Sequence, residues 1–104
     1  MVKLFHDEII YLEGANVNVK IKSPLEEFTT RDTLKNMESM LPSDNFMRIH
    51  DSFIVNLKYL KGYARNYTQL DLQFDLKSEK YTLPVGKKYR DLFKNKMLGN
   101  LNDS

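Results

Sequence analysis

Hydrophobic and polar residues near the start of the chain alternate with a period of two. Val17, Val19 and Ile21 are separated by polar residues, so their side chains are expected on one face of a half-buried strand. The preceding run 9–12 is apolar and typical of a second strand. Residues 14–16, Gly-Ala-Asn, have the composition of a turn. The pattern therefore predicts a hairpin.

A third strand and a short helix are expected next. Residues 26–30 have strand character, and Thr30 is a candidate N-cap because a threonine hydroxyl can accept from free helical N–H groups. The helix would cover residues 31–41 and end before Pro42. Its apolar face is formed by three residues at helical spacing: Leu34, Met37 and Leu41.

The middle of the chain predicts two further strands. Residues 46–56 are rich in apolar and β-branched residues, interrupted by the polar turn His50–Ser52, and we expect both flanks, Phe53 included, to be buried. Residues 57–63 continue this pattern toward Gly62. Asn56 is expected to end the second strand.

The last third of the chain predicts a hairpin and a helix. Leu70, Leu72 and Phe74 alternate with polar residues, and residues 80–85 are the expected partner strand. A final helix from residue 87 would end at Gly99. Its apolar positions are Tyr89, Leu92, Phe93 and Met97. The chain is therefore predicted to be mainly β, with one short central helix and a C-terminal helix.

Composition narrows the class of protein. The 104 residues, 41% of them hydrophobic, suffice for a single domain. The sequence contains no cysteine and only two histidines, His6 and His50, which excludes thiol catalysis, a disulfide framework and a His-rich metal site. No apolar run approaches the ~20 residues that span a bilayer. We expect a soluble protein without membrane contact, cofactor, metal or enzymatic activity, and the absence of cysteine leaves its redox compartment undetermined.

Charge is distributed unevenly along the chain. The net charge of +2 arises from −3 in residues 1–56 and +5 in residues 57–104, so the second half is the expected electrostatic footprint of an anionic partner. Lys87, Lys88 and Arg90 lie at the start of the last helix. Each cation there opposes the helix dipole by roughly 0.3–1 kcal/mol, and a bound phosphate would remove the conflict. The alternative is that these are tolerated surface cations.

The polar turn inside residues 46–56 also has two interpretations. His50, Asp51 and Ser52 either hydrogen-bond within the turn or face a partner. On physical grounds alone the first interpretation is favoured, because polar residues beside buried strands are normally paired internally.

The central motif resembles the signature of LytTR DNA-binding domains. Its residues are Phe46-x-Arg48-Ile49-His50-x-Ser52-Phe53-Ile54-Val55-Asn56, after a Leu41-Pro42 helix end. The terminal segment Leu83-Pro84-Val85-Gly86-Lys87-Lys88-Tyr89 is also similar to the family's, and the resemblance covers residues 9–97. It implies several small antiparallel sheets and a module that reads double-stranded DNA with loop side chains.

The resemblance further implies the output domain of a bacterial two-component response regulator, binding repeated sites as a possible homodimer. A sensor kinase would act only through a receiver domain, which this sequence does not contain. Only eight residues precede Ile9, so we expect a trimmed domain whose first sheet is incomplete.

Base or backbone contacts are implied for eight residues: Asn16, Asn18, His50, Asp51, Ser52, Lys87, Lys88 and Arg90. Three of the family's usual residues are replaced. Asp51 stands where Arg, Lys or Asn is common, Asn18 replaces a frequent aromatic, and Gly86 replaces a frequent Ser. An aspartate repels phosphate, but it can accept a hydrogen bond from cytosine N4. If Asp51 instead accepts a local turn bond, it has no role in DNA binding.

Two other functions compete with DNA binding. Asp51 and the modest net charge motivate a LytTR-like protein-interaction module that has lost DNA binding. A carboxylate-dependent hydrolase built on Asp71 and Asp75, which share a strand face, is far less favoured because such pairs are usually solvated.

Overall fold

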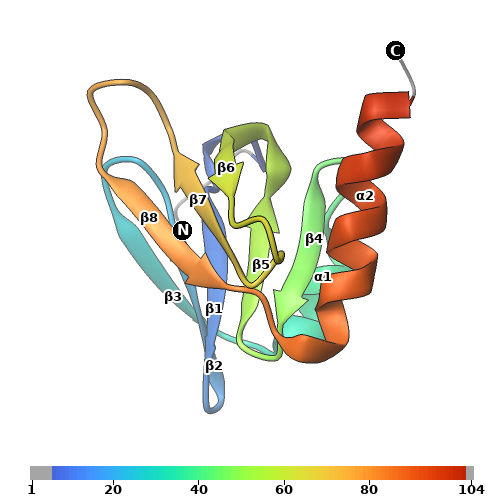
Figure 1. The fold of residues 1–104 in the computed structure, drawn as a ribbon. Coiled ribbons are helices and arrows are strands. Elements are labelled where there is room, and N and C mark those ends of the chain that lie inside the picture. The colour runs from blue at the N-terminus through green and yellow to red at the C-terminus, as the bar shows by residue number, and fades with distance from the viewer. Residues whose placement is uncertain (1–5, 103–104) are drawn as a thin grey trace.

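The computed structural model describes residues 6–102, which form two antiparallel sheets and two α-helices (Figure 1). The first sheet has the strand order β3-β2-β1-β5-β4, and the second has the order β6-β7-β8. The predicted mainly β class, with a short central helix and a C-terminal helix, is confirmed. The first sheet contains β1 (Tyr11–Ala15), β2 (Asn18–Lys22), β3 (Glu27–Arg31), β4 (Phe46–His50) and β5 (Phe53–Asn56).

The remaining elements are short, apart from the last helix. They are the 3₁₀ turns η1 (His6–Glu8), η2 (Leu57–Tyr59) and η3 (Lys87–Tyr89), the strands β6 (Leu60–Tyr63), β7 (Gln69–Gln73) and β8 (Lys80–Pro84), and the helices α1 (Leu34–Met40) and α2 (Arg90–Asn102). Neither helix in the described range is long and apolar enough to cross a membrane.

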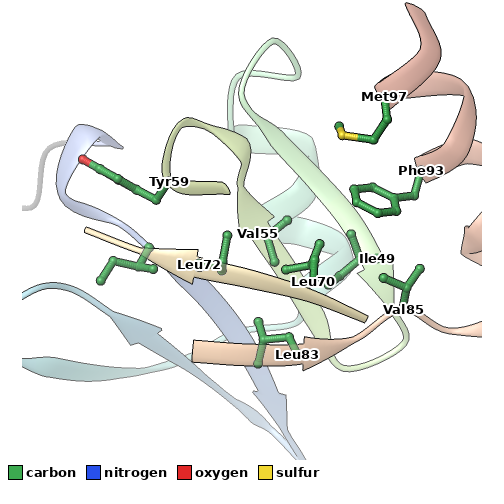
Figure 2. Packing of buried hydrophobic residues seen from close by; sticks show 10 residues of the cluster. Ile49, Val55, Tyr59, Leu70, Leu72, Leu83, Val85, Phe93 and Met97 are labelled. Atoms are coloured by element: carbon green, nitrogen blue, oxygen red, sulfur yellow. The ribbon is translucent and has the colours of Figure 1, made fainter. Parts of the chain in front are cut away.

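Two hydrophobic clusters pack on opposite faces of the first sheet. Adjacent strand residues point to opposite faces, and Ile54 and Val55 of β5 accordingly enter different clusters. The larger cluster fills the space between the two sheets and α2, as Figure 2 shows for Leu70, Leu72 and Phe93. The smaller cluster lies under α1. This arrangement fixes α2 and α1 on different sides of the strands that carry the central turn.

The first hairpin turns one residue later than the sequence predicts. Gly14 and Ala15 belong to β1, and Ala15 pairs with Asn18, so the turn consists of Asn16 and Val17. Asn16 has a φ of 60°, a left-handed conformation that asparagine tolerates in tight turns. The expected burial of Val17 is wrong, since it is 59% exposed. Gly14 instead allows the close approach of Leu34, whose Cδ1 would lie 3.1 Å from a Cβ at position 14.

The first helix also begins later than predicted. Thr30 is paired with Val19 within the sheet, and the N-cap is Thr33, whose hydroxyl accepts from the Asn36 N–H at 3.1 Å. The predicted apolar face is otherwise present: Leu34 and Leu41 are buried, and Met37 packs beside them.

The later predictions need three corrections. Gly99 lies inside α2 and does not end it, because it does not adopt the left-handed conformation of a helix-ending glycine. Leu92 is 59% exposed, whereas Phe93 and Met97 are buried as expected. Phe53 is only half-buried, because it is the first residue of β5, directly after the polar turn, where its ring lies beside the His50 ring.

Candidate nucleic-acid interface

Three segments that are far apart in the sequence meet at one end of the molecule, the lower end in Figure 1. They are the β1–β2 turn, the β4–β5 turn and the start of the last helix, and together we call them the tip. Backbone hydrogen bonds join them: the Gly14 N–H donates to the Ser52 carbonyl at 2.9 Å, and the Gly86 N–H donates to the Ile49 carbonyl at 2.7 Å. Five of the eight residues implied by the resemblance lie within these turns and the 3₁₀ turn η3. His50 directly precedes the β4–β5 turn, and Asn18 and Arg90 directly follow the β1–β2 turn and η3.

The β4–β5 turn is closed by its own histidine. The Ser52 N–H donates to His50 Nδ1 at 3.0 Å, which agrees with the prediction of hydrogen bonding within the turn. In the neutral imidazole this bond leaves the proton on Nε2, so the ring can present a donor on its other side. The strand register shifts between Arg48 and His50, and the resulting bulge sets the direction of the turn.

The Arg48 guanidinium holds the backbone of the same turn in place. Its Nε donates to the His50 carbonyl at 2.9 Å, and Nη2 donates to the Asp51 carbonyl at 2.7 Å. Its Nη1 lies 3.2 Å from a carboxylate oxygen of Glu38 in α1, and the arginine side chain is only 18% exposed. Sequence reasoning included Arg48 in the motif but assigned it no role. The available signal was a cation within an apolar strand, directly before a polar turn.

Asp51 contacts the start of the last helix. Its Oδ1 atom accepts from Lys88 Nζ and from the Tyr89 hydroxyl, both at 2.9 Å. The Lys88 and Tyr89 hydrogen bonds lower the pKa of this carboxyl, and the Asp51 hydrogen bond raises the pKa of Lys88. The interpretation of Asp51 as an acceptor within its own turn is therefore wrong, because the partners of its carboxylate lie in another element.

The basic segment Lys87–Arg90 is divided among different environments. Lys87 and Lys88 occupy η3, and α2 begins only at Arg90. Lys88 is paired with Asp51, and Arg90 donates through Nε to the Val85 carbonyl at 3.4 Å. Lys87 is exposed and forms no ion pair with any residue between 6 and 102. Gly86 precedes η3 and has no side chain that could accept a hydrogen bond from the N–H groups at the start of η3. An external anion can therefore approach these N–H groups.

A groove connects the first hairpin to the central turn. Asn16 and Asn18 line it from one side, and Arg48 and Asp51 line it from another. The N-terminal end of α1 contributes Asp32, Thr33, Leu34 and Lys35. Lys35 lies outside the predicted contact set. The groove therefore offers amide, carboxylate and ammonium groups on one concave surface.

Other polar residues considered at the sequence level have structural partners. Asn56 is buried and ends β5 as expected, donating to the Ile9 carbonyl at 2.9 Å and accepting from the Lys58 N–H at 3.0 Å. Asp71 accepts from the Thr82 hydroxyl, and Asp75 accepts from the Ser78 hydroxyl. Within residues 6–102, no group of three or more His, Asp or Glu side chains is placed to hold a metal ion.

Comparisons with known proteins match most of the chain. A family model described as the LytTr DNA-binding domain matches residues 1–98. A solved Bacillus cereus chain, described as the LytTr DNA-binding domain of a methyl-accepting/DNA response regulator, superposes with a TM-score of 0.69 at 30% sequence identity. That match covers 88% of this chain and 82% of the other.

Curated relatives are longer proteins. The transcriptional regulatory protein NatR of Bacillus subtilis is 30% identical over 88 residues, which are 85% of this chain and 37% of NatR. The sensory transduction protein LytT of the same organism is 39% identical over 54 residues, 52% of this chain and 22% of LytT. The sensory transduction protein LytR of Staphylococcus saprophyticus is 30% identical over 94 residues, 88% of this chain and 35% of LytR. The chain therefore spans roughly a fifth to two fifths of the relatives it matches.

Proposed function

Because the chain belongs to the family of LytTR DNA-binding domains, we propose that it is the sequence-specific DNA-reading output domain of a bacterial response regulator and that the tip enters the major groove. The observation that carries this proposal is the convergence at the tip of two distant polar turns and the basic start of the last helix. Direct readout needs several polar side chains on one rigid projection, together with cations for the phosphates.

The chemistry of the tip suggests how the work is divided. Asn16, Asn18, His50 and Ser52 offer hydrogen-bonding groups suited to base edges. Lys87 and Arg90 lie at the positive end of the α2 dipole, where a phosphate oxygen is stabilised by cations and by free backbone N–H groups. The tip is thus expected to place base contacts at its centre and phosphate contacts on the side of α2.

The rest of the regulator follows from the family. We propose that two copies bind repeated sites on one duplex and that a receiver domain, outside this sequence, couples binding to a sensor kinase. NatR is a transcriptional regulatory protein, LytT is a sensory transduction protein, and the similar Bacillus cereus chain belongs to a response regulator, which supports a role in signal-dependent transcription. Because its target is bacterial DNA, the domain is expected to act in the cytoplasm.

The proposal is tested by selecting the sequences that the domain binds from a random pool of DNA duplexes. The affinity of the domain for the enriched sequence is then measured at several salt concentrations. Log affinity should fall linearly with log salt concentration, and Lys87→Ala should reduce the slope by about one, since one phosphate contact is lost. Lys77→Ala is the matched control because Lys77 is exposed in the β7–β8 loop, at the other end of the molecule in Figure 1. Absence of any enriched sequence, or equal slopes for all three proteins, would overturn the proposal.

A protein-interaction module is the competing function. An apolar groove between β4 and α2, lined by Phe46, Met47, Ile54 and the exposed Leu92, is the observation in its favour. An apolar contact depends little on salt, so the same titration distinguishes the two functions.

A further inference from the structure

Only one of the two oxygens of the Asp51 carboxylate has a partner within the described part of the chain. Lys88 Nζ and the Tyr89 hydroxyl both bind Oδ1, each at 2.9 Å. Within the described part of the chain, no hydrogen bond or ion pair reaches the other oxygen, Oδ2. Because a carboxylate has acceptor capacity on both oxygens, Oδ2 remains able to accept a hydrogen bond from a partner.

The surroundings of Asp51 hold this acceptor in place. Arg48 Nη2 donates to the carbonyl oxygen of Asp51 at 2.7 Å, so the backbone that carries the carboxylate is held in place. Gly86 leaves room for Tyr89: a Cβ at position 86 would lie 3.2 Å from Tyr89 Cδ2 and 3.4 Å from His50 Cδ2. The two departures from the family pattern, Asp51 and Gly86, are thus structurally connected. Gly86 leaves space for the Tyr89 ring, and the Tyr89 hydroxyl binds Asp51.

Stability does not explain the Asp51–Lys88 pair. Both side chains are 69% exposed, and an ion pair in that setting contributes little to the free energy of unfolding. The pair does change the electrostatics of the tip, because the Lys88 ammonium offsets a negative charge that would otherwise repel DNA phosphates.

We propose that Asp51, Lys88 and Tyr89 form one reading unit, in which Asp51 Oδ2 accepts a hydrogen bond from an exocyclic amino group in the major groove. Cytosine N4 and adenine N6 are the two donors of this kind, whereas guanine and thymine present only acceptors at the corresponding edge. Lys88 and Tyr89 are positioning residues for the carboxylate. The proposal rests on the proposed DNA-binding function and specifies what one position of the tip reads.

The unit predicts that Lys88 affects base selectivity through Asp51. In the parent domain, one base position of the enriched site should prefer a base with an amino group over its single-base variants. Asp51→Asn should reduce this preference about 5- to 100-fold, the range expected for one lost base contact, without a general gain in affinity. Lys88→Met should reduce preference at the same position, and adding Lys88→Met to Asp51→Asn should change the preference little further.

Tyr89→Phe and base analogues complete the test. Tyr89→Phe removes only the hydroxyl, so a smaller loss at the same position is expected. A duplex that carries 2-pyrimidinone in place of cytosine, or purine in place of adenine, lacks the amino group, and its weaker binding identifies which base donates. Amide NMR spectra of each variant should match the parent's, which separates these effects from a loss of fold.

Three outcomes would overturn the reading unit while leaving the proposed function intact. Asp51→Asn would strengthen binding to all duplexes equally if the carboxylate only repels phosphate. Lys88→Met would weaken binding to all duplexes and lower the salt slope if Lys88 only contacts phosphate. Unchanged discrimination in both variants would show that the turn reads no amino group. Failure of the parent domain to select any sequence would instead refute DNA recognition itself.

Discussion

Two turns of this domain contain an exposed aspartate, and they differ in where its partners lie. In the β7–β8 loop, the Asp75 carboxylate accepts from the Lys77 N–H at 2.9 Å and from the Ser78 hydroxyl at 2.7 Å. In the β4–β5 turn, the Asp51 carboxylate is bound by Lys88 and Tyr89, which lie in η3. The first aspartate closes its own turn, whereas the second joins two distant parts of the chain.

The difference separates a structural turn from a candidate binding turn. A loop whose polar groups bond one another requires no partner and needs only the hairpin beneath it. The β4–β5 turn is closed by the His50 imidazole, so its carboxylate is available for contacts outside the turn. The locality of the hydrogen bonds, and not the residue type, distinguishes the two ends of the molecule.

The largest expected effect concerns the core on which both turns rest. Leu72 is fully buried between the sheets, whereas Leu76 in the β7–β8 loop is 89% exposed. Leu72→Ala should lower the free energy of unfolding by ~2–5 kcal/mol, through lost burial and a cavity, whereas Leu76→Ala should change it by less than ~0.5 kcal/mol. Urea denaturation measures both values. Equal midpoints for the two variants would refute the assignment of Leu72 to the core.

The next effect distinguishes the side chains that hold each turn. Arg48 binds two carbonyls of the β4–β5 turn, and Gln73 donates to the Ser78 carbonyl in the other loop at 2.8 Å. Arg48→Ala should destabilise the fold by roughly 1.5–3 kcal/mol, and Gln73→Ala should cost about 0.5–1.5 kcal/mol. DNA affinity should fall roughly tenfold or more only for Arg48→Ala, because the turn is no longer held in one conformation. A similar loss of affinity in the folded Gln73 variant would contradict the comparison.

The smallest expected effect is on the pKa values of the two aspartates. The Ser78 hydrogen bond lowers the pKa of Asp75, and the Lys88 hydrogen bond lowers the pKa of Asp51. Both carboxylates therefore add stability at neutral pH that is lost as pH falls through their lowered pKa values. Lys88→Met should raise the pKa of Asp51 toward its ordinary value and leave that of Asp75 unchanged, whereas Ser78→Ala should do the reverse. Carboxyl NMR titration measures both, and a shift of both groups in either variant would exclude independent turns.

Strand patterns explain which parts of the fold the sequence predicts. The alternating pattern correctly predicts the burial of four strand residues, because a period of two places alternate side chains on the one face that packs against the core. These residues are Val19, Ile21, Leu70 and Leu72. Alternation also includes Val17, which is exposed, because the pattern contains no information about where a two-residue turn reverses the chain. Element types were thus predicted more accurately than element ends.

The tip could be predicted only in part. The resemblance of the motif identified the turns. The contact of Asp51 with Lys88 and Tyr89, however, depends on the β4 register shift and on the close approach of the Tyr89 ring to Gly86. Neither feature has a local sequence pattern. For the same reason the clamping role of Arg48 was missed, since its partners are backbone carbonyls and Glu38 in α1.

The central claim is tested most directly by NMR. The amide chemical shifts of the isotopically labelled domain are compared before and after the enriched duplex is added. If the tip reads DNA, the largest shift changes should occur at Asn16, Asn18 and residues 50–52 and 87–90, while residues 75–79 remain unchanged. Shift changes centred on residues 75–79, or bound DNA that leaves the tip unperturbed, would contradict the account.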